Sequence, residues 1–518
     1  MRILFVHPGF PAQFRHVAQA LVQQGHAVRA LCQKPPEGAA PEFDVPGVQV
    51  HAYGLPRGGT PGAQGWVAEL ELRAIRGEAA LQAALALRDE QGFAPHVMLA
   101  HAGLGDSLFL KAVWPGARLG LWGAHYHDAA SARHADHDPG LSPLQALDAA
   151  ARARAEALVQ AQLRMRNAQL DLHLREADGL LVPTDWQAAR FPAPWRERLW
   201  VAHDGIDTEA LAPNAQVRAT LPGDVALAPG DEVVSFVARS LEPRRGLQVV
   251  MRALPRLLAQ RPAARVLIVG AEGPGQGPLP ADGRSWKQHL IDEVLPQMPE
   301  ADWQRVHFLG PLPHAHVVAV LQLAAVHVHW AYPLALSRSL LEAMSTGCAV
   351  VAGDTAPVRE VLADGETGRL LEFFDAEALA DEVARLLQAP AERQRLGAQA
   401  RQCVQARYDL HGVCLPRQLQ WLQALADGAA APAPAPTPDA AQALRAELAR
   451  AEQARDQAQQ AAALAQAQLE QAGRARDSAE AGRQAADALL QEAVQALAGV
   501  RQLLEAEAEA MEAAPPLV

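Results

Sequence analysis

The feature that most constrains the fold of this chain is an alternation of short, β-rich apolar runs with longer helical patterns, which occurs twice along the sequence. This alternation is typical of βαβ units, in which helices bury a parallel sheet on both faces. The first series ends near residue 200, and the second starts after the segment HDGID at residues 203–207. Parallel α/β domains bind ligands at the carboxyl ends of their strands. Two such domains in tandem therefore predict a shared cleft.

The sequence predicts an α/β fold with two Rossmann-like domains, each built on a parallel sheet. We expect strands at residues 2–7, 27–31, 48–52, 97–101, 119–122, 179–183 and 199–202, and then at 233–238, 265–270, 306–309, 325–329, 349–352 and 368–371. Amphipathic patterns predict helices between them, at residues 13–24, 144–176, 246–259, 285–294, 313–323, 337–345, 357–362 and 376–387. The domains are expected to cover residues 1–203 and 204–400, followed by a helix over 401–427.

Composition changes sharply after this helix. Residues 428–438 read GAAAPAPAPTP, which favours an extended, semi-rigid spacer. Residues 439–518 are rich in Ala, Gln and Glu and have high helix propensity. Because Leu490, Val494, Leu497 and Leu504 keep coiled-coil spacing, we favour a self-associating coiled coil, with a solvated single helix or a partly disordered tail as alternatives. The chain is thus a candidate homo-oligomer.

The charge and the cysteines limit the function classes. A formal net charge of −12 argues against general nucleic-acid binding, which needs a surplus of Lys and Arg. The apolar run at residues 3–6 is too short for a signal segment or a membrane span, and the four cysteines have neither disulfide-framework nor metal-ligand spacing. We therefore expect a cytoplasmic protein. Arginines between residues 152 and 166 leave a peripheral membrane contact open, although a solvated helix face is favoured.

Two segments of the second domain could bind an anion. In VARSLEPRRGL, Arg239 follows a buried strand and Arg245 directly precedes a helix start, so both guanidinium groups could clasp phosphate oxygens. In the segment that begins LSRSLLEAM, a turn leads into a helix that carries Ser337, Ser339 and Glu342. Hydroxyls and amides in a first helical turn suit a diphosphate, and the carboxylate of Glu342 would be costly in this apolar stretch without a partner. The sequence thus predicts a diphosphate site.

The ordered set HDGID, ARSLEPRRG, LLEAMSTGCAVVAGDTAPVREV and DGETGRLL resembles the retaining glycosyltransferase family 4, of GT-B fold. The resemblance implies that Arg239 and Arg245 hold the diphosphate of a UDP- or GDP-type sugar donor and that Glu342 holds its ribose. It also implies sugar transfer to a glycan or lipid-linked hydroxyl with retained configuration, without a cofactor or divalent metal. The helix over 401–427 would then cross back to the first domain.

One position departs from the family pattern. The family has a Glu eight residues before the one that corresponds to Glu342, where it contacts the transferred sugar, but Leu334 stands there in this chain. Tyr332, Ser337 and backbone amides are candidates to take over that contact.

In the first domain, His101 ends a predicted strand, and by similarity to the family it would approach the transferred sugar. The loop PGFPAQF resembles the acceptor loop of the fold, with Gly9 and Phe10 as acceptor-side residues. The segment GAHYHDAASARHADHDPG contains His125 and His127, together with two further histidines, His134 and His137. We expect acceptor or lid contacts from a mobile loop there rather than a zinc site, because zinc ligands usually come from ordered elements.

Two other functions stay open. A nucleotide-sugar epimerase of the same architecture would need an acid/base pair that the sequence does not identify. An inactive GT-B scaffold, acting through its helical arm, would be consistent with Leu334 in place of the family's Glu.

Overall fold

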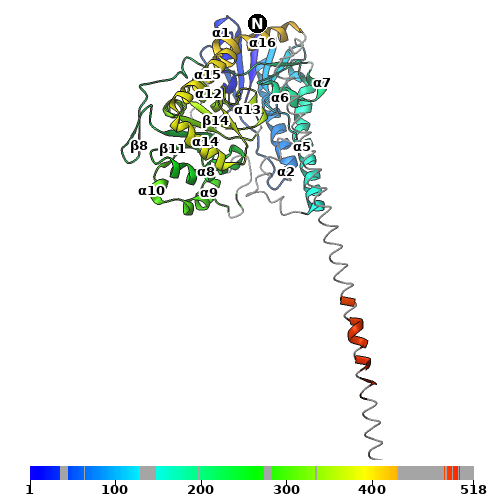
Figure 1. The fold of residues 1–518 in the computed structure, drawn as a ribbon. Coiled ribbons are helices and arrows are strands. Elements are labelled where there is room, and N and C mark those ends of the chain that lie inside the picture. Colours follow the sequence, from blue (N-terminus) through cyan, green and yellow to red (C-terminus); the bar gives the residue numbers. More distant parts are fainter. Residues whose placement is uncertain are drawn as a thin grey trace, which may run out of the picture. The chain divides into compact units, whose positions relative to one another are not determined.

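The computed structural model describes residues 1–35, 45–63, 65–128, 148–196, 198–273, 280, 283–332 and 335–429, and helical pieces between residues 483 and 501. The chain forms two compact units, Met1–Pro434 and Ala435–Val518. The first unit contains two parallel sheets, each covered by helices, so the predicted fold class is confirmed (Figure 1).

The first sheet has seven parallel strands in the order β3-β2-β1-β4-β5-β6-β7. They are β1 (Arg2–Val6), β2 (Ala27–Gln33), β3 (Gln49–Tyr53), β4 (Val97–His101), β5 (Arg118–Trp122), β6 (Gly179–Val182) and β7 (Leu199–Val201). The helices are α1 (Arg15–Gln23), which follows the short turn η1 (Ala12–Phe14), α2 (Gly65–Asp89), α3 (Leu110–Val113), α5 (Ala149–Glu176), α6 (Asp185–Arg190) and α7 (Ala193–Arg196).

The second sheet has six parallel strands in the order β12-β11-β10-β13-β14-β15. They are β10 (Val233–Ser240), β11 (Arg265–Ala271), β12 (Val306–Gly310), β13 (Val326–His329), β14 (Ala349–Gly353) and β15 (Arg369–Leu371). A small antiparallel hairpin, β8 (Ala219–Leu221) and β9 (Val225–Leu227), precedes it.

Helices cover both faces of the second sheet. They are η4 (Pro243–Arg245), α8 (Leu247–Gln260), α9 (Trp286–Val294), η5 (Leu295–Gln297), α10 (Glu300–Trp303), α11 (His314–Leu323), α12 (Arg338–Ser345), α13 (Ala356–Arg359), α14 (Ala376–Gln388) and α15 (Pro390–Tyr408). Helices α8 and α14 pack together on one face, and α12 and α15 pack together on the other (Figure 1).

Alternate side chains of each strand enter different cores, which explains the continuous apolar runs in the sequence. In β1, Ile3 and Phe5 pack in the core that contains α1, whereas Leu4 and Val6 pack in the core that contains α2. The four-residue apolar run of β1 thus contributes side chains to both cores.

The predicted helix over 401–427 is interrupted in the structure. Helix α15 ends at Tyr408, a π-helical turn covers η6 (Leu410–Cys414), and α16 (Leu415–Asp427) follows. The interruption has a tertiary cause, since Asp409 accepts hydrogen bonds from the hydroxyl of Thr208 at 2.6 Å and from the amide of Gly412, and bridges to Ile206. The chain passes between the two domains twice, near residues 206–208 and near residues 409–412, and these contacts join the two segments.

Helix α16 packs beside α1 on the first sheet (Figure 1). Its Trp421 and Leu425 lie over Gly120 of β5 and Gly179 of β6. A Cβ atom at Gly120 would lie 2.5 Å from Leu425 and 2.9 Å from Trp421, so this close approach requires glycine.

The second unit is described only in part. Its described residues between 483 and 501 are helical, and Leu490 and Val494 are exposed. Leu497 and Leu504 of the predicted coiled-coil stripe lie outside the described residues. Among the described residues, no helix has the length and apolar character needed to cross a bilayer.

Candidate active site

A pocket of about 330 Å³ opens at the carboxyl ends of β10, β11 and β13. This is the point in the second sheet where the strand order reverses, because β10 lies between β11 and β13. Ligands of open α/β sheets bind at such switch points. The polar side chains that line it include Arg239, Arg245, His329, Ser337, Arg338 and Ser339.

Arg239 and Arg245 lie side by side at this pocket. Arg239 is the second-last residue of β10 and is exposed, whereas Arg245 ends η4 and is partly buried. Burial lowers the pKa of Arg245, the charge of Arg239 acts in the same direction, and Glu242 acts against both. Within the described residues, neither guanidinium has a hydrogen-bond or ion-pair partner. Two adjacent cations in this condition favour an anionic ligand.

Gly246 sets the position of Arg245. Its φ of 74° is left-handed, and a Cβ atom there would lie 2.4 Å from the carbonyl oxygen of Trp330. Only glycine fits this approach, which brings η4 against the end of β13.

The N-terminus of α12 faces the same pocket. Ser337 is its N-cap residue, with extended backbone, but its hydroxyl does not cap the helix and instead lies 2.9 Å from the hydroxyl of Ser339. The first-turn amides thus have no side-chain cap, and together with two hydroxyls they form a site that suits phosphate oxygens.

Glu342 is buried, as the sequence suggested, but the protein already compensates its charge. Its Oε1 atom accepts from the Nε atom of Arg338 at 3.0 Å and lies 2.9 Å from the Nε2 atom of His314. The cost of burial therefore does not by itself call for a ribose partner, which corrects that part of the sequence argument. Glu342 is not among the residues that line the pocket.

Two pocket residues were missed in the sequence. Arg338, about half exposed, lies between the two predicted serines, and its place four residues before Glu342 was an available signal. His329 ends β13, and burial lowers its pKa to about 4, with the charge of Arg245 adding to the effect. It would have been found by the strand-end argument applied to His101.

Tyr332 is not placed to contact a donor. Its ring stacks on Phe373 at 4.6 Å, and its hydroxyl accepts a hydrogen bond from Gln248 at 3.2 Å. This side chain is therefore part of the core of the second domain, which corrects its assignment to the donor site. Leu334, where the family has Glu, lies outside the described residues.

His101 ends β4, and its ring packs edge-on against that of His7 at the end of β1, 6.0 Å away. Burial lowers the pKa of both histidines, that of His7 to about 4, while the charge of Asp204 partly opposes the effect at His101. His7 was missed although it also ends a strand. Both rings are thus neutral near pH 7 and lie where cleft residues are expected.

Of the two predicted acceptor-side residues in the loop PGFPAQF, Phe10 is buried and Gly9 is exposed. Phe10 is fully buried and packs against Phe5, so it is a core residue and not an acceptor contact, which corrects its assignment. Gly9 is exposed, and its amide donates to the Nδ1 atom of His7 at 3.0 Å.

His125 and His127 lie in the described part of this segment, after the end of β5. The side chain of Asn167 bonds both the amide and the carbonyl oxygen of His127, at 3.0 and 2.8 Å, and the two histidine rings are 4.9 Å apart. His134 and His137 lie outside the described residues. Among the described residues, no group of three or more His, Cys, Asp or Glu is arranged to hold a metal ion.

Contacts from the second domain reach the first on two sides of the cleft. The carboxylate of Glu360 accepts from the amides of Asp185 and Trp186, at 2.9 and 3.0 Å, and so caps α6. The charge of Arg338 lowers the pKa of His16 on α1 and of His203 in the linker, after the larger effect of burial. The start of α12 therefore lies within electrostatic reach of α1 and of the linker.

Comparisons with known proteins agree with this architecture. A family model described as glycosyl transferase family 4 group matches residues 24–211, and one described as glycosyl transferases group 1 matches residues 220–403. D-inositol 3-phosphate glycosyltransferase from Nocardia farcinica is 28% identical over 232 residues, which cover 44% of this chain and 49% of that relative. Phosphatidyl-myo-inositol mannosyltransferase from Mycolicibacterium smegmatis is 33% identical over 180 residues, covering 34% and 41%. The chain thus spans about half the length of the curated relatives it matches.

Two solved structures share the fold over an equal fraction of the chain. Sucrose-phosphate synthase from Thermosynechococcus elongatus has a TM-score of 0.60 at 19% identity, covering 82% of this chain and all of that one. HepE from Anabaena, solved with UDP and glucose, has a TM-score of 0.53 at 17% identity and the same coverage. The two family models together account for most of the chain, and the chain therefore belongs to the group 1 glycosyltransferases of family 4, with a GT-B fold.

Proposed function

We propose that this protein transfers a sugar from a nucleoside diphosphate donor to a hydroxyl group of a glycan or lipid-linked acceptor. The observation that carries the proposal is the convergence of Arg239, Arg245 and the N-terminus of α12 on one pocket at the switch point of the second sheet. The pocket is large enough for part of a nucleotide, and its cationic side suits a diphosphate.

In this reaction the bond from the anomeric carbon to the diphosphate oxygen breaks, and a bond from the acceptor oxygen to the same carbon forms. Negative charge grows on the leaving diphosphate, so fixed cations that face it stabilise the transition state more than the ground state. Arg239 and Arg245 are placed for this role, and Arg338, which also pairs with Glu342, lines the same pocket. They would supply the compensation for which other transferases use a divalent metal, which supports metal-independent transfer.

We further propose that the configuration at the anomeric carbon is retained. In a same-face displacement, the leaving phosphate accepts the acceptor's proton, and no protein nucleophile is required. His101 and His7 would line the sugar and acceptor side, where a neutral imidazole can donate a hydrogen bond to a sugar hydroxyl.

The identity of the ligands rests on relatives. A UDP-type donor is supported by the structural neighbour solved with UDP, and mannose as the transferred sugar by the mannosyltransferase among the relatives. A GDP-type donor stays open beside the UDP-type. Inositol-containing acceptors in the relatives' names support a polyol or lipid-linked acceptor, which would place the protein at the cytoplasmic face of a membrane. Self-association through the helical arm, by its exposed Leu490 and Val494, belongs to the same proposal.

The test is calorimetric titration of the full chain with UDP and GDP, followed by incubation with UDP- and GDP-sugars. Binding of either nucleotide with a Kd in the micromolar range and release of free nucleotide in the presence of acceptor are expected. An altered free sugar donor without acceptor would instead identify an epimerase. No binding of any nucleotide or nucleotide sugar would leave the scaffold alternative.

A further inference from the structure

His329 is a buried polar side chain of the donor pocket that the proposed reaction does not use. It is the last residue of β13 and lines the pocket, although only 6% of it is exposed. Among the described residues, its ring nitrogens have no hydrogen-bond partner. A buried polar group without a partner costs free energy, so this ring is placed to gain from a ligand.

Strand pairing fixes the direction in which this ring points. Side chains of a strand alternate between the two faces of the sheet, and Val326 and Val328 of β13 pack in the core that contains α8. His329 therefore points to the opposite face, where its neighbour on β14, Ala352, packs in the core that contains α12. The ring thus lies on the face that α12 covers, and the first turn of α12 lines the same pocket.

His327, two residues earlier on the same face, has an internal contact. It is fully buried, and its Nδ1 atom lies 2.9 Å from the hydroxyl of Ser235 on β10. His329 lies instead at the end of the strand, close to η4. A Cβ atom at Gly246 would lie 2.4 Å from the carbonyl oxygen of Trp330, so the residues directly before these two, Arg245 and His329, are held at the same edge of the sheet.

The imidazole of His329 is neutral at pH 7. Burial, and after it the charge of Arg245, lower its pKa to about 4. A neutral imidazole has one N–H donor and one acceptor nitrogen. Next to a guanidinium group and an uncapped first helical turn, the expected ligand is an anion, and the ring N–H can donate to one of its oxygens. The ring thus adds a directional donor without a further positive charge that would repel Arg245.

We propose that His329 is a donor-binding residue whose ring N–H donates a hydrogen bond to the diphosphate of the sugar donor, beside Arg245. The inference rests on the proposed transferase function and adds one contact with the same donor. Because the diphosphate gains negative charge as the sugar leaves, this hydrogen bond strengthens in the transition state. It also differs from a packing role in a measurable way, since it acts on the phosphoryl groups and not on the nucleoside.

The experiment compares ligands with and without phosphoryl groups on the full chain. The wild type and His329→Leu are titrated by calorimetry with UDP, GDP, inorganic pyrophosphate, uridine and guanosine. We expect the variant to bind pyrophosphate and the preferred nucleoside diphosphate about tenfold more weakly, as for the loss of one hydrogen bond to a charged group, and the nucleoside within about twofold of the wild type. If the nucleosides bind too weakly to measure, the pyrophosphate titration decides.

Two conservative variants separate the hydrogen bond from the shape of the side chain. His329→Asn and His329→Gln each keep an amide N–H, near the positions of Nδ1 and Nε2, and one of them should recover affinity for the nucleoside diphosphate to within about threefold of the wild type. His307→Leu is the matched control, because His307 is a half-buried histidine of β12 in the same sheet and is not among the residues that line the pocket. It should bind every probe as the wild type does.

Unchanged affinity of folded His329→Leu for pyrophosphate and for the nucleoside diphosphate would overturn the inference. An equal loss for the nucleoside, or a loss that neither amide variant reduces, would overturn it as well. If His329→Leu fails to fold, His329→Ala takes its place. Failure of the wild type to bind UDP, GDP and pyrophosphate would refute the transferase proposal itself, whereas wild-type binding with an unaffected variant refutes only the role of His329.

Discussion

Replacement of Arg245 by alanine tests the donor site most directly. The guanidinium is partly buried at the pocket, beside Arg239, and has no hydrogen-bond or ion-pair partner among the described residues, so its loss removes ligand contacts rather than internal ones. A hydrogen bond to a charged group contributes roughly 1.5–3 kcal/mol, and about 1.4 kcal/mol is a factor of ten. We therefore expect kcat/KM for the donor, and affinity for UDP or GDP, to fall about 10- to 150-fold.

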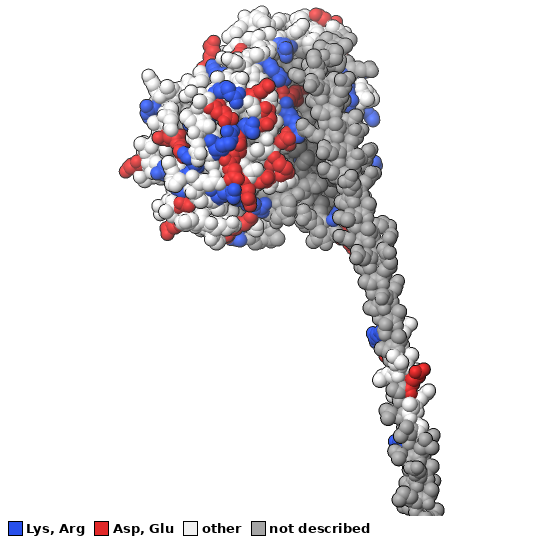
Figure 2. Space-filling model, in the orientation of Figure 1, with Lys and Arg blue, Asp and Glu red and all other residues white. Residues whose placement is uncertain are grey.

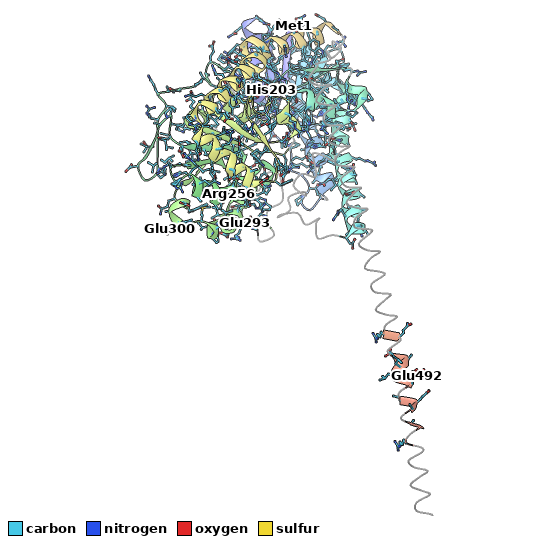
Figure 3. The ribbon with its side chains drawn as sticks, in the orientation of Figure 1. Met1, His203, Arg256, Glu293, Glu300 and Glu492 are labelled. Carbon is cyan, nitrogen blue, oxygen red and sulfur yellow. The ribbon has the colours of Figure 1, made fainter. Side chains whose placement is uncertain are left out.

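The assay is nucleotide release under donor-limited conditions, together with calorimetric titration of the nucleotide. Arg239→Ala should lose less, about tenfold, because Arg239 is exposed and solvent screens its charge. Arg245→Lys should fall between the wild type and alanine, since it keeps the charge but not the planar fork. Arg256, on α8 of the same domain and paired at 2.6 Å with Asp381, supplies the control Arg256→Ala (Figure 3). If Arg245→Ala and this control are both within twofold of the wild type, the diphosphate assignment is wrong.

Three further outcomes are expected. Gly246→Ala should lower the free energy of unfolding by more than the roughly 1–2 kcal/mol of left-handed backbone strain, because its Cβ would meet the Trp330 carbonyl, and thermal unfolding measures this. His7, whose pKa is depressed from 6.5 to about 4, contributes stability that is present above pH 6.5 and lost as the pH falls to 4; His7→Gln should shrink this pH dependence by up to about 3 kcal/mol, and parallel wild-type and variant profiles would contradict it. Deletion after Gly428 should leave donor kcat/KM within twofold while lowering the mass seen by sedimentation, and an unchanged number of chains per particle would retire the coiled coil.

The strands could be predicted because their signal is local. A strand buried on both faces must be apolar at successive positions, as residues 3–6 are, and every expected strand is present with its ends shifted by at most two residues. The hairpin β8–β9 has only three residues in each strand and no such run. The break at Asp409 depends on two contacts, a local one with the amide of Gly412 and a distant one with Thr208, 201 residues away, and the second cannot be read from neighbouring sequence.

The same distinction applies to the site. Arg239, Arg245 and Ser337 were located by a rule that needs only neighbouring sequence, that strand ends and helix starts meet at one edge of a parallel sheet. Phe10 and Tyr332 also follow strands, but whether they face a ligand depends on partners elsewhere, Phe5 and Phe373. Sequence adjacency could not decide that question.

Most charged side chains on the surface of the second domain that Figure 2 shows lie near side chains of opposite charge. On the face in Figure 2, Lys and Arg alternate with Asp and Glu over the second domain, where pairs such as Arg256 with Asp381 and Arg385 with Glu392 neutralise each other. Such exposed pairs contribute about 0–1 kcal/mol and indicate no ligand.

The polar residues of the candidate site differ in whether their hydrogen-bonding groups already have partners inside the protein. The hydroxyl of Tyr332 is bonded to Gln248, and the carboxylate of Glu342 is bonded to Arg338 and His314, so neither gains much from a ligand. Arg245 and the uncapped first turn of α12 keep unused donors at the rim of a pocket. Fixed donors without internal acceptors cost stability in the free protein, and the proposed diphosphate would offset that cost. Loss of Glu342 should therefore act mainly through Arg338, which lines the pocket and would lose the carboxylate that fixes its guanidinium group. Addition of Arg338→Ala to a Glu342 variant should restore little activity, because it removes that guanidinium group from the pocket as well.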